Sequence, residues 1–184
     1  MTAHRILIAG IGNIFLGDDA FGVEVARRLL EREMPKEVRV ADFGIRGLDL
    51  AYALLDGYEA VVMVDAAPRG GRPGTLYLIE PDRSQPLVAD DASVVEGHSL
   101  NPEKVLRLAA AMGGCSGRLL LVGCEPTRAD ADDELWGGFA LSDPVRVAVD
   151  QAVGLIEALI PRLLRGEEIG ASEDDLFLKR FLEV

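Results

Sequence analysis

Apolar and polar residues alternate along the chain in blocks that predict strands and helices in turn. Nearly continuous apolar runs at residues 4–9, 60–65 and 118–123 are typical of strands covered on both faces, and residues 38–42 form a shorter β-branched run. Apolar positions at helical spacing predict helices at residues 21–30, 48–55, 102–109 and 143–164. This order predicts an α/β protein with three layers, in which a mostly parallel sheet lies between helices.

One further strand is expected to break the parallel pattern. Residues 75–79 look like a strand, but only the glycine- and proline-rich turn at residues 68–74 separates them from the strand before. A parallel crossover needs a dozen or more residues, so this strand is predicted to be antiparallel or to lie at an edge.

Length and charge limit the classes of protein that the chain can belong to. Its 184 residues, 49% of them hydrophobic, suit a single domain over residues 1–166, followed by an acidic tail, residues 167–184, that is expected to be loosely ordered. The net charge of −12 argues against nucleic acid and anionic lipid as partners. Without an apolar stretch of roughly 18 residues or a signal peptide, the chain is predicted to be cytoplasmic.

The supply of reactive residues excludes several enzyme chemistries. With only two histidines in the chain, His4 and His98, and His4 at the far end of the first strand, a zinc site with two histidines cannot form. There is no GxSxG elbow and no phosphate-binding GxxxxGK[ST], and the dinucleotide motif begun by Gly10 and Gly12 lacks its third glycine. The two cysteines, Cys115 and Cys124, form no CxxC pair and are expected to be ordinary small residues.

Acidic residues follow three of the predicted parallel strands. Asp18 and Asp19 follow the first, Asp42 ends the second, Asp65 ends the third, and His98 lies in a loop before a helix. Each has an ordinary alternative: the Asp pair could only cap the next helix, and the others could bond to nearby backbone. Since ligands bind at the carboxyl ends of such strands, their convergence predicts a metal site with oxygen and nitrogen ligands.

These residues also match a known family. Over residues 5–164 the chain resembles the endopeptidases that mature nickel-iron hydrogenases. The shared motifs are GxGN followed by DD and glycine (Gly10 to Gly22), DxGxxG (Asp42 to Gly47), Asp65-Ala66 after an apolar strand, and His98-Ser99-Leu100. The resemblance implies a twisted, five-stranded sheet between helices.

The resemblance also implies an activity and a ligand set. Such enzymes remove a C-terminal extension from the hydrogenase large subunit after nickel insertion, which makes the large-subunit precursor the partner of a monomeric protease. Their metal-binding trio falls on Asp19, Asp65 and His98, and Asp42 and Gly47 become candidates for substrate binding. Many relatives carry Glu at the position of Asp19, and Gly and Thr where this chain has Phe43 and Ile45. No catalytic nucleophile is assigned.

Two carboxylates and one imidazole, without a thiolate, should bind nickel weakly, so nickel is expected to arrive with the substrate. Because no protease nucleophile is evident, a non-catalytic nickel-site sensor or chaperone of the immature large subunit is the alternative, and a small-molecule hydrolase a more distant one. Two long polar loops, residues 80–97 and 124–140, are candidates for docking the large subunit, with Trp136 as an apolar anchor.

Overall fold

The computed structural model describes residues 5–81, 102–114, 117–127 and 140–169. The strands are β1 (Ile6–Ile11), β2 (Val38–Gly44), β3 (Ala60–Ala66), β4 (Leu76–Ile79) and β5 (Arg118–Cys124). The helices are α1 (Phe21–Leu30), α2 (Gly47–Ala53), α3 (Pro102–Ala111) and α4 (Asp143–Leu164), with a short 3-10 helix, η1 (Gly17–Ala20), before α1. Within the described segments, no helix has the length and apolar content needed to span a bilayer.

The five strands form one sheet in the order β2-β1-β3-β5-β4. The first four are parallel to their neighbours, while β4 runs antiparallel to β5 and occupies an edge. Both expectations for the strand after the short turn are therefore confirmed, because seven residues of turn can reverse the chain but cannot carry it back to the other end of the sheet.

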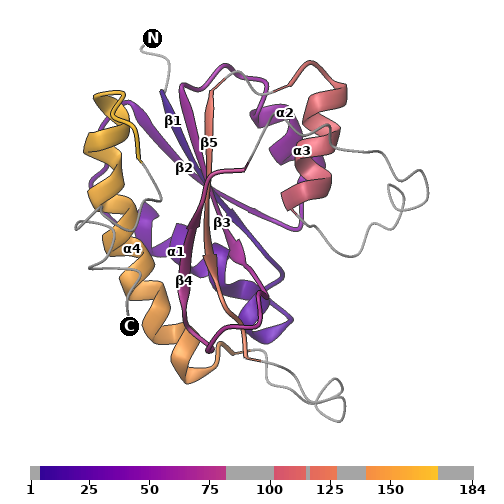
Figure 1. Cartoon of the computed structure of the whole chain (residues 1–184), viewed down its shortest axis with the longest axis vertical. Helices are drawn as coiled ribbons and strands as arrows, with labels where there is room; N and C mark the ends of the chain where they lie inside the picture. The colour runs from indigo at the N-terminus through magenta and orange to yellow at the C-terminus, as the bar shows by residue number, and fades with distance from the viewer. Residues whose placement is uncertain (1–4, 82–101, 115–116, 128–139, 170–184) are drawn as a thin grey trace.

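Helices cover both faces of the sheet and confirm the three-layer α/β prediction (Figure 1). Alternate residues of β1 enter different cores: Ile6 and Ile8 pack with α1 and α4, and Leu7 and Ala9 pack with α2 and α3. This division explains the continuous apolar runs, since a strand buried on both faces has no solvent-facing positions. The carboxyl ends of β1, β2, β3 and β5 share one edge of the sheet, which we call the carboxyl edge.

Two glycines let α1 lie directly against the strands. A β-carbon at Gly22 would lie 2.0 Å from the carbonyl oxygen of Val64 and 2.4 Å from that of Ile11. A β-carbon at Gly10 would in turn lie 2.4 Å from the carbonyl oxygen of Gly22. This close approach brings the start of α1, and η1 immediately before it, onto the carboxyl ends of β1 and β3.

The hydrophobic core extends past the boundary expected at residue 166. The side chain of Ile169 is only 2% exposed and belongs to the core of α1 and α4. The guanidinium of Arg118, from β5, donates hydrogen bonds to the carbonyl oxygens of Glu167 (2.9 Å) and Ile169 (3.0 Å). The start of the expected tail is thus packed, and its remainder, residues 170–184, lies outside the described residues.

Candidate active site

The turn after β1 places Asp19 at the carboxyl edge. Gly12 has a φ of +137°, and a β-carbon there would lie 1.8 Å from the carbonyl oxygen of Asp19, so only glycine lets η1 fold down onto the strand. The Asp19 carboxylate accepts a hydrogen bond of 2.7 Å from the backbone N–H of Asn13. This carboxylate therefore organises the turn, and neither η1 nor α1 has a side-chain N-cap bond.

Asp65, near the end of β3, is one of two buried acidic side chains within the described segments. It is 5% exposed and accepts a 2.9 Å hydrogen bond from the N–H of Ala66. Burial, followed by the negative charge of Asp19, raises the pKa of Asp65 to about 8, and the Ala66 bond offsets only part of this rise. The negative charge of the half-buried Asp19 thus opposes ionisation of the buried Asp65.

A buried carboxylate beside a second carboxylate is suited to hold a proton or a cation between them. At neutral pH the raised pKa leaves Asp65 largely protonated, and a cation would favour its charged form. The donor set of Asp19 and Asp65 therefore fits a divalent metal ion. Within the described segments no group of three His, Cys, Asp or Glu residues could hold a metal, and the third expected ligand, His98, lies outside those segments.

Asp18, adjacent to Asp19, has a different task. Its carboxylate accepts hydrogen bonds from the N–H of Thr127 (2.8 Å), the N–H of Ser142 (2.7 Å) and the hydroxyl of Ser142 (2.9 Å). These donors lie 109 and 124 residues away along the chain. Asp18 therefore ties η1 both to the segment after β5 and to the start of α4, and it braces the turn that carries Asp19.

The side chain of Asp42 does not lie on the same face of the sheet as that of Asp65. Its β2 neighbour Val40 packs in the core of α1 and α4, whereas Met63 on β3 belongs to the core of α2 and α3. Because side chains alternate along a strand, Asp42 and Asp65 point to opposite faces of the sheet. Asp42 instead forms an ion pair of 3.7 Å with Arg27 of α1. The other candidate for substrate binding, Gly47, is the first residue of α2.

Glu125, which directly follows β5, is a buried acid that the sequence patterns did not single out. It accepts hydrogen bonds from the N–H groups of Arg69 (2.8 Å) and Gly70 (3.0 Å) and from the hydroxyl of Tyr77 (2.8 Å). Burial alone would raise the pKa of Glu125, but these bonds outweigh it and hold the pKa below its ordinary value. Glu125 thus fixes the turn after Asp65. Its position after an apolar strand, like that of Asp65, was the signal available in the sequence.

The one cysteine that the structure describes is not a nucleophile. Cys124 is fully buried at the end of β5, and burial, with the charges of Asp18 and Glu125, raises the pKa of its thiol to about 12. Its expected role as a small buried residue is confirmed, and Cys115 lies outside the described segments.

Fold and site together define an α/β protein with a buried acid, Asp65, beside the half-buried Asp19 at the carboxyl edge of a five-stranded sheet. A family model described as hydrogenase maturation protease, HycI, matches residues 23–159. The chain is 31% identical over 181 residues to the hydrogenase expression/formation protein HupD of Rhodobacter capsulatus, covering 96% of this chain and 83% of that protein. The chain belongs to the hydrogenase maturation protease family.

Solved structures agree with this assignment. The hydrogenase maturating endopeptidase HybD from E. coli superimposes with a TM-score of 0.65 at 25% identity, over 86% of this chain and 93% of that one. The NiFe hydrogenase maturation protease HycI from Thermococcus kodakarensis superimposes with a TM-score of 0.63 at 27% identity, over 85% of this chain and 92% of that one. The family resemblance noted from the motifs is therefore confirmed, and the chain is an endopeptidase of this type.

Proposed function

We propose that this protease removes the C-terminal extension of a nickel-iron hydrogenase large subunit once nickel has been inserted. The observation that carries the proposal is the buried carboxylate of Asp65 beside Asp19 at the carboxyl edge. Two neighbouring carboxylates, one of them buried, form an acceptor for a cation. In this proposal the cation is part of the substrate, so cleavage depends on prior nickel insertion.

The residues of the chain have distinct roles in this proposal. Asp19 is oriented by the Asn13 N–H, so one of its oxygens is already engaged and the carboxylate cannot swing freely. Asp65 is raised in pKa to about 8, so it gives up its proton when a cation compensates its charge. His98 supplies a nitrogen ligand.

A site that binds free nickel weakly would make cleavage depend on nickel already inserted in the precursor, and this dependence is the checkpoint that we propose. A site in which Asp65 is largely protonated at neutral pH binds free metal more weakly than one with an ionised carboxylate, because binding must first displace that proton. The free protein should therefore hold little nickel, and the large-subunit precursor should bring it. A nickel ion at these ligands supplies Lewis-acid chemistry, since it polarises a peptide carbonyl or lowers the pKa of a bound water.

Family membership favours this protease over the non-catalytic sensor or chaperone that the sequence left open. To distinguish the protease from the sensor or chaperone, the purified protein is incubated with its nickel-loaded precursor, and the mass of the large subunit is measured by mass spectrometry. Loss of a C-terminal peptide supports proteolysis, whereas a stable complex of unchanged mass contradicts it. Precursor prepared without nickel should remain intact, and its cleavage at the same rate would refute the checkpoint.

The same assay tests the three proposed ligands. Asp19→Asn, Asp65→Asn and His98→Ala should each lower the cleavage rate by about 100-fold or more, because each change removes one metal ligand. Asp49→Asn, an exposed acid on α2, is the matched control and should cleave normally. A ligand variant that cleaves at the rate of the unaltered protein would remove that residue from the site.

A further inference from the structure

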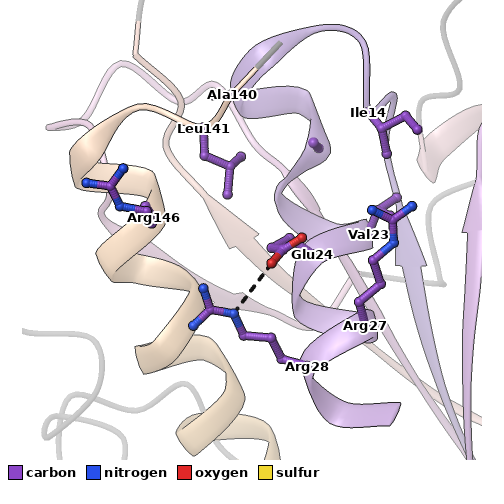
Figure 2. Close-up of a pocket in the computed structure, with 9 residues that line it drawn as sticks. Ile14, Val23, Glu24, Arg27, Arg28, Ala140, Leu141 and Arg146 are labelled. Carbon is purple, nitrogen blue, oxygen red and sulfur yellow. Dashed lines mark ion pairs between the residues drawn. The ribbon is translucent and has the colours of Figure 1, made fainter. Parts of the chain in front are cut away.

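A pocket of about 270 Å³ opens between α1 and α4, beside the turn that carries Asp19 (Figure 2). Its apolar lining includes Ile14 from that turn, Val23 from α1 and Leu141 from the segment before α4. Three arginines surround these side chains, and the side chain of Leu141 points toward the middle of the group. Neither the sequence motifs nor the acid pair gives this pocket a role.

The charge of the pocket is opposite to that of the whole chain. The chain carries a net charge of −12, yet among the residues that the structure describes the pocket is lined by Arg27, Arg28 and Arg146 against a single acid, Glu24. Arg28 lies 3.6 Å from Glu24 and also forms an ion pair with Asp150 of α4, so Glu24 and Arg28 neutralise each other. The lining is left with two arginines in excess, and the acids that pair with them lie outside the lining.

Those two arginines keep unused hydrogen-bond donors. The Nε of Arg27 lies 3.7 Å from the Asp42 carboxylate, and Arg27 forms no hydrogen bond with any residue that the structure describes. Arg146 pairs with Asp143 of its own helix, and the two side chains are 61% and 85% exposed. Exposed pairs of this kind are weak, so an incoming anion can compete for both guanidinium groups.

The lining combines guanidinium donors with the apolar side chains of Val23 and Leu141, and this combination is complementary to a carboxylate that has an apolar side chain next to it. Arginine binds carboxylates through two parallel hydrogen bonds, and Val23 and Leu141 would cover the adjoining side chain. We propose that this pocket binds a carboxylate of a peptide and that, under the proposed function, the peptide is the C-terminal extension of the precursor. The carboxylate belongs either to the chain end or to an acidic residue next to an apolar one.

The position of the pocket agrees with this assignment. Ala20, which lines it, directly follows Asp19 in η1, and Arg27 lies seven residues farther along the chain through α1. At 1.5 Å per helical residue this is a separation of about 10 Å, which roughly three extended residues can span. A peptide held at Arg27 can therefore reach the turn that carries Asp19.

The test measures binding of three fluorescein-labelled pentapeptides to the full chain by fluorescence anisotropy. One is tetra-alanyl-leucine with a free carboxyl terminus, one is its C-terminal amide, and one is an amide with glutamate before the leucine. We expect the free acid to bind and to shift the methyl NMR signals of Val23 and Leu141. Arg27→Gln and Arg146→Gln should each weaken its binding about tenfold. Arg32→Gln is the control, because its 52% exposed side chain pairs with Glu157 of α4 outside the pocket.

Peptide binding in this assay requires neither nickel nor cleavage, so its result tests the pocket assignment independently of the proposed function. Equal binding of the plain amide, equal loss in Arg32→Gln, or equal competition by inorganic phosphate would overturn the pocket assignment. Binding of the glutamate-containing amide supports it and identifies a side-chain carboxylate as the ligand. Selective binding in a protein that cleaves no nickel-loaded precursor would refute only the protease proposal, whereas cleavage without selective binding would refute only the pocket.

Discussion

At the scale of single residues, the ionised form of Asp65 lowers the free energy of unfolding, because its carboxylate is buried next to Asp19. Its pKa is about 8 in the folded chain against an ordinary value of 3.8, mainly because burial disfavours the charge. An acid whose folded pKa is raised costs no stability while it is protonated, and it costs progressively more as the pH rises from the unfolded value to the folded one. Without metal, the protein should therefore lose stability between about pH 4 and pH 8 through this residue.

Asp65→Asn should remove this loss. The amide oxygen can still accept the bond from Ala66, but no charge is buried. At pH 8.5, with a chelator present, we expect the variant to be more stable than the unaltered chain by up to about 6 kcal/mol, because the pKa is raised from 3.8 to about 8 and each unit corresponds to about 1.4 kcal/mol. At about pH 3.5, below the unfolded pKa of 3.8, Asp65 is protonated in both states and the two should unfold at similar temperatures. Thermal melts at both pH values provide the measurement, and a difference independent of pH would contradict the account.

The neighbouring aspartates should respond differently to mutation. Asp18→Ala removes three bonds that join η1 to Thr127 and Ser142, so we expect a loss of about 2–3 kcal/mol in the free energy of unfolding. Asp19→Asn keeps an oxygen for the Asn13 N–H and should change stability by much less. Urea denaturation of both variants distinguishes the roles. If Asp19→Asn proved the more destabilising, Asp19 would be the structural member of the pair.

At the scale of elements, the site depends on how closely α1 approaches the sheet. The contact of Gly22 with the backbone of β1 and β3 leaves no room for a side chain, and the opposing atoms are carbonyl groups that cannot turn away. Since η1 leads directly into α1, any outward shift of the helix also displaces Asp19. Helix packing and site geometry are therefore coupled through Gly22, together with Gly10 of β1.

Gly22→Ala should consequently cost about 3 kcal/mol or more, at the upper end for overpacking a core. A suitable control is Gly57→Asn. Gly57 has a φ of +78°, and a β-carbon at this position would meet no atom within 4 Å, so only a backbone cost of about 1 kcal/mol is expected there. Urea denaturation measures both. Equal losses in the two variants would show that packing against β1 and β3 is not the cause.

At the scale of the whole molecule, the core includes a residue beyond the end of α4. Ile169 returns to the core of α1 and α4, and Arg118 from the middle of the chain binds the carbonyl groups around it. A domain boundary at residue 166 would therefore cut through packed structure. The compact unit, as far as the structure describes it, includes residues 167–169.

Two truncations test this boundary. A chain that ends at residue 166 loses the buried Ile169 and two acceptors of Arg118, so its melting temperature should fall by about 5 °C or more, given roughly 1.5–3 kcal/mol for burying an isoleucine. A chain that ends at residue 170 keeps these contacts and is the control. Indistinguishable melting temperatures would show that residues 167–169 contribute nothing to the core.

Local patterns were sufficient for most of the fold and for part of the site. Period and length identified the strands and helices, the seven-residue turn required an antiparallel edge strand, and the strand-end rule selected Asp19 and Asp65. The same rule also selected Asp42, which faces the other side of the sheet and pairs with Arg27. The position of an acid at the end of a strand does not reveal which face of the sheet its side chain occupies. That face depends on which of the two cores the alternate residues of the strand enter.

The sequence by itself therefore determined the class of fold, the family and the acids available for chemistry, since these depend on residue types and short-range spacing. Only the tertiary structure decided that Asp18 braces the turn, that Asp65 is buried beside Asp19, and that Ile169 belongs to the core. Each of these results depends on groups that are far apart in the chain. Their contacts arise from sheet register and helix packing, which bring together residues that no local pattern relates.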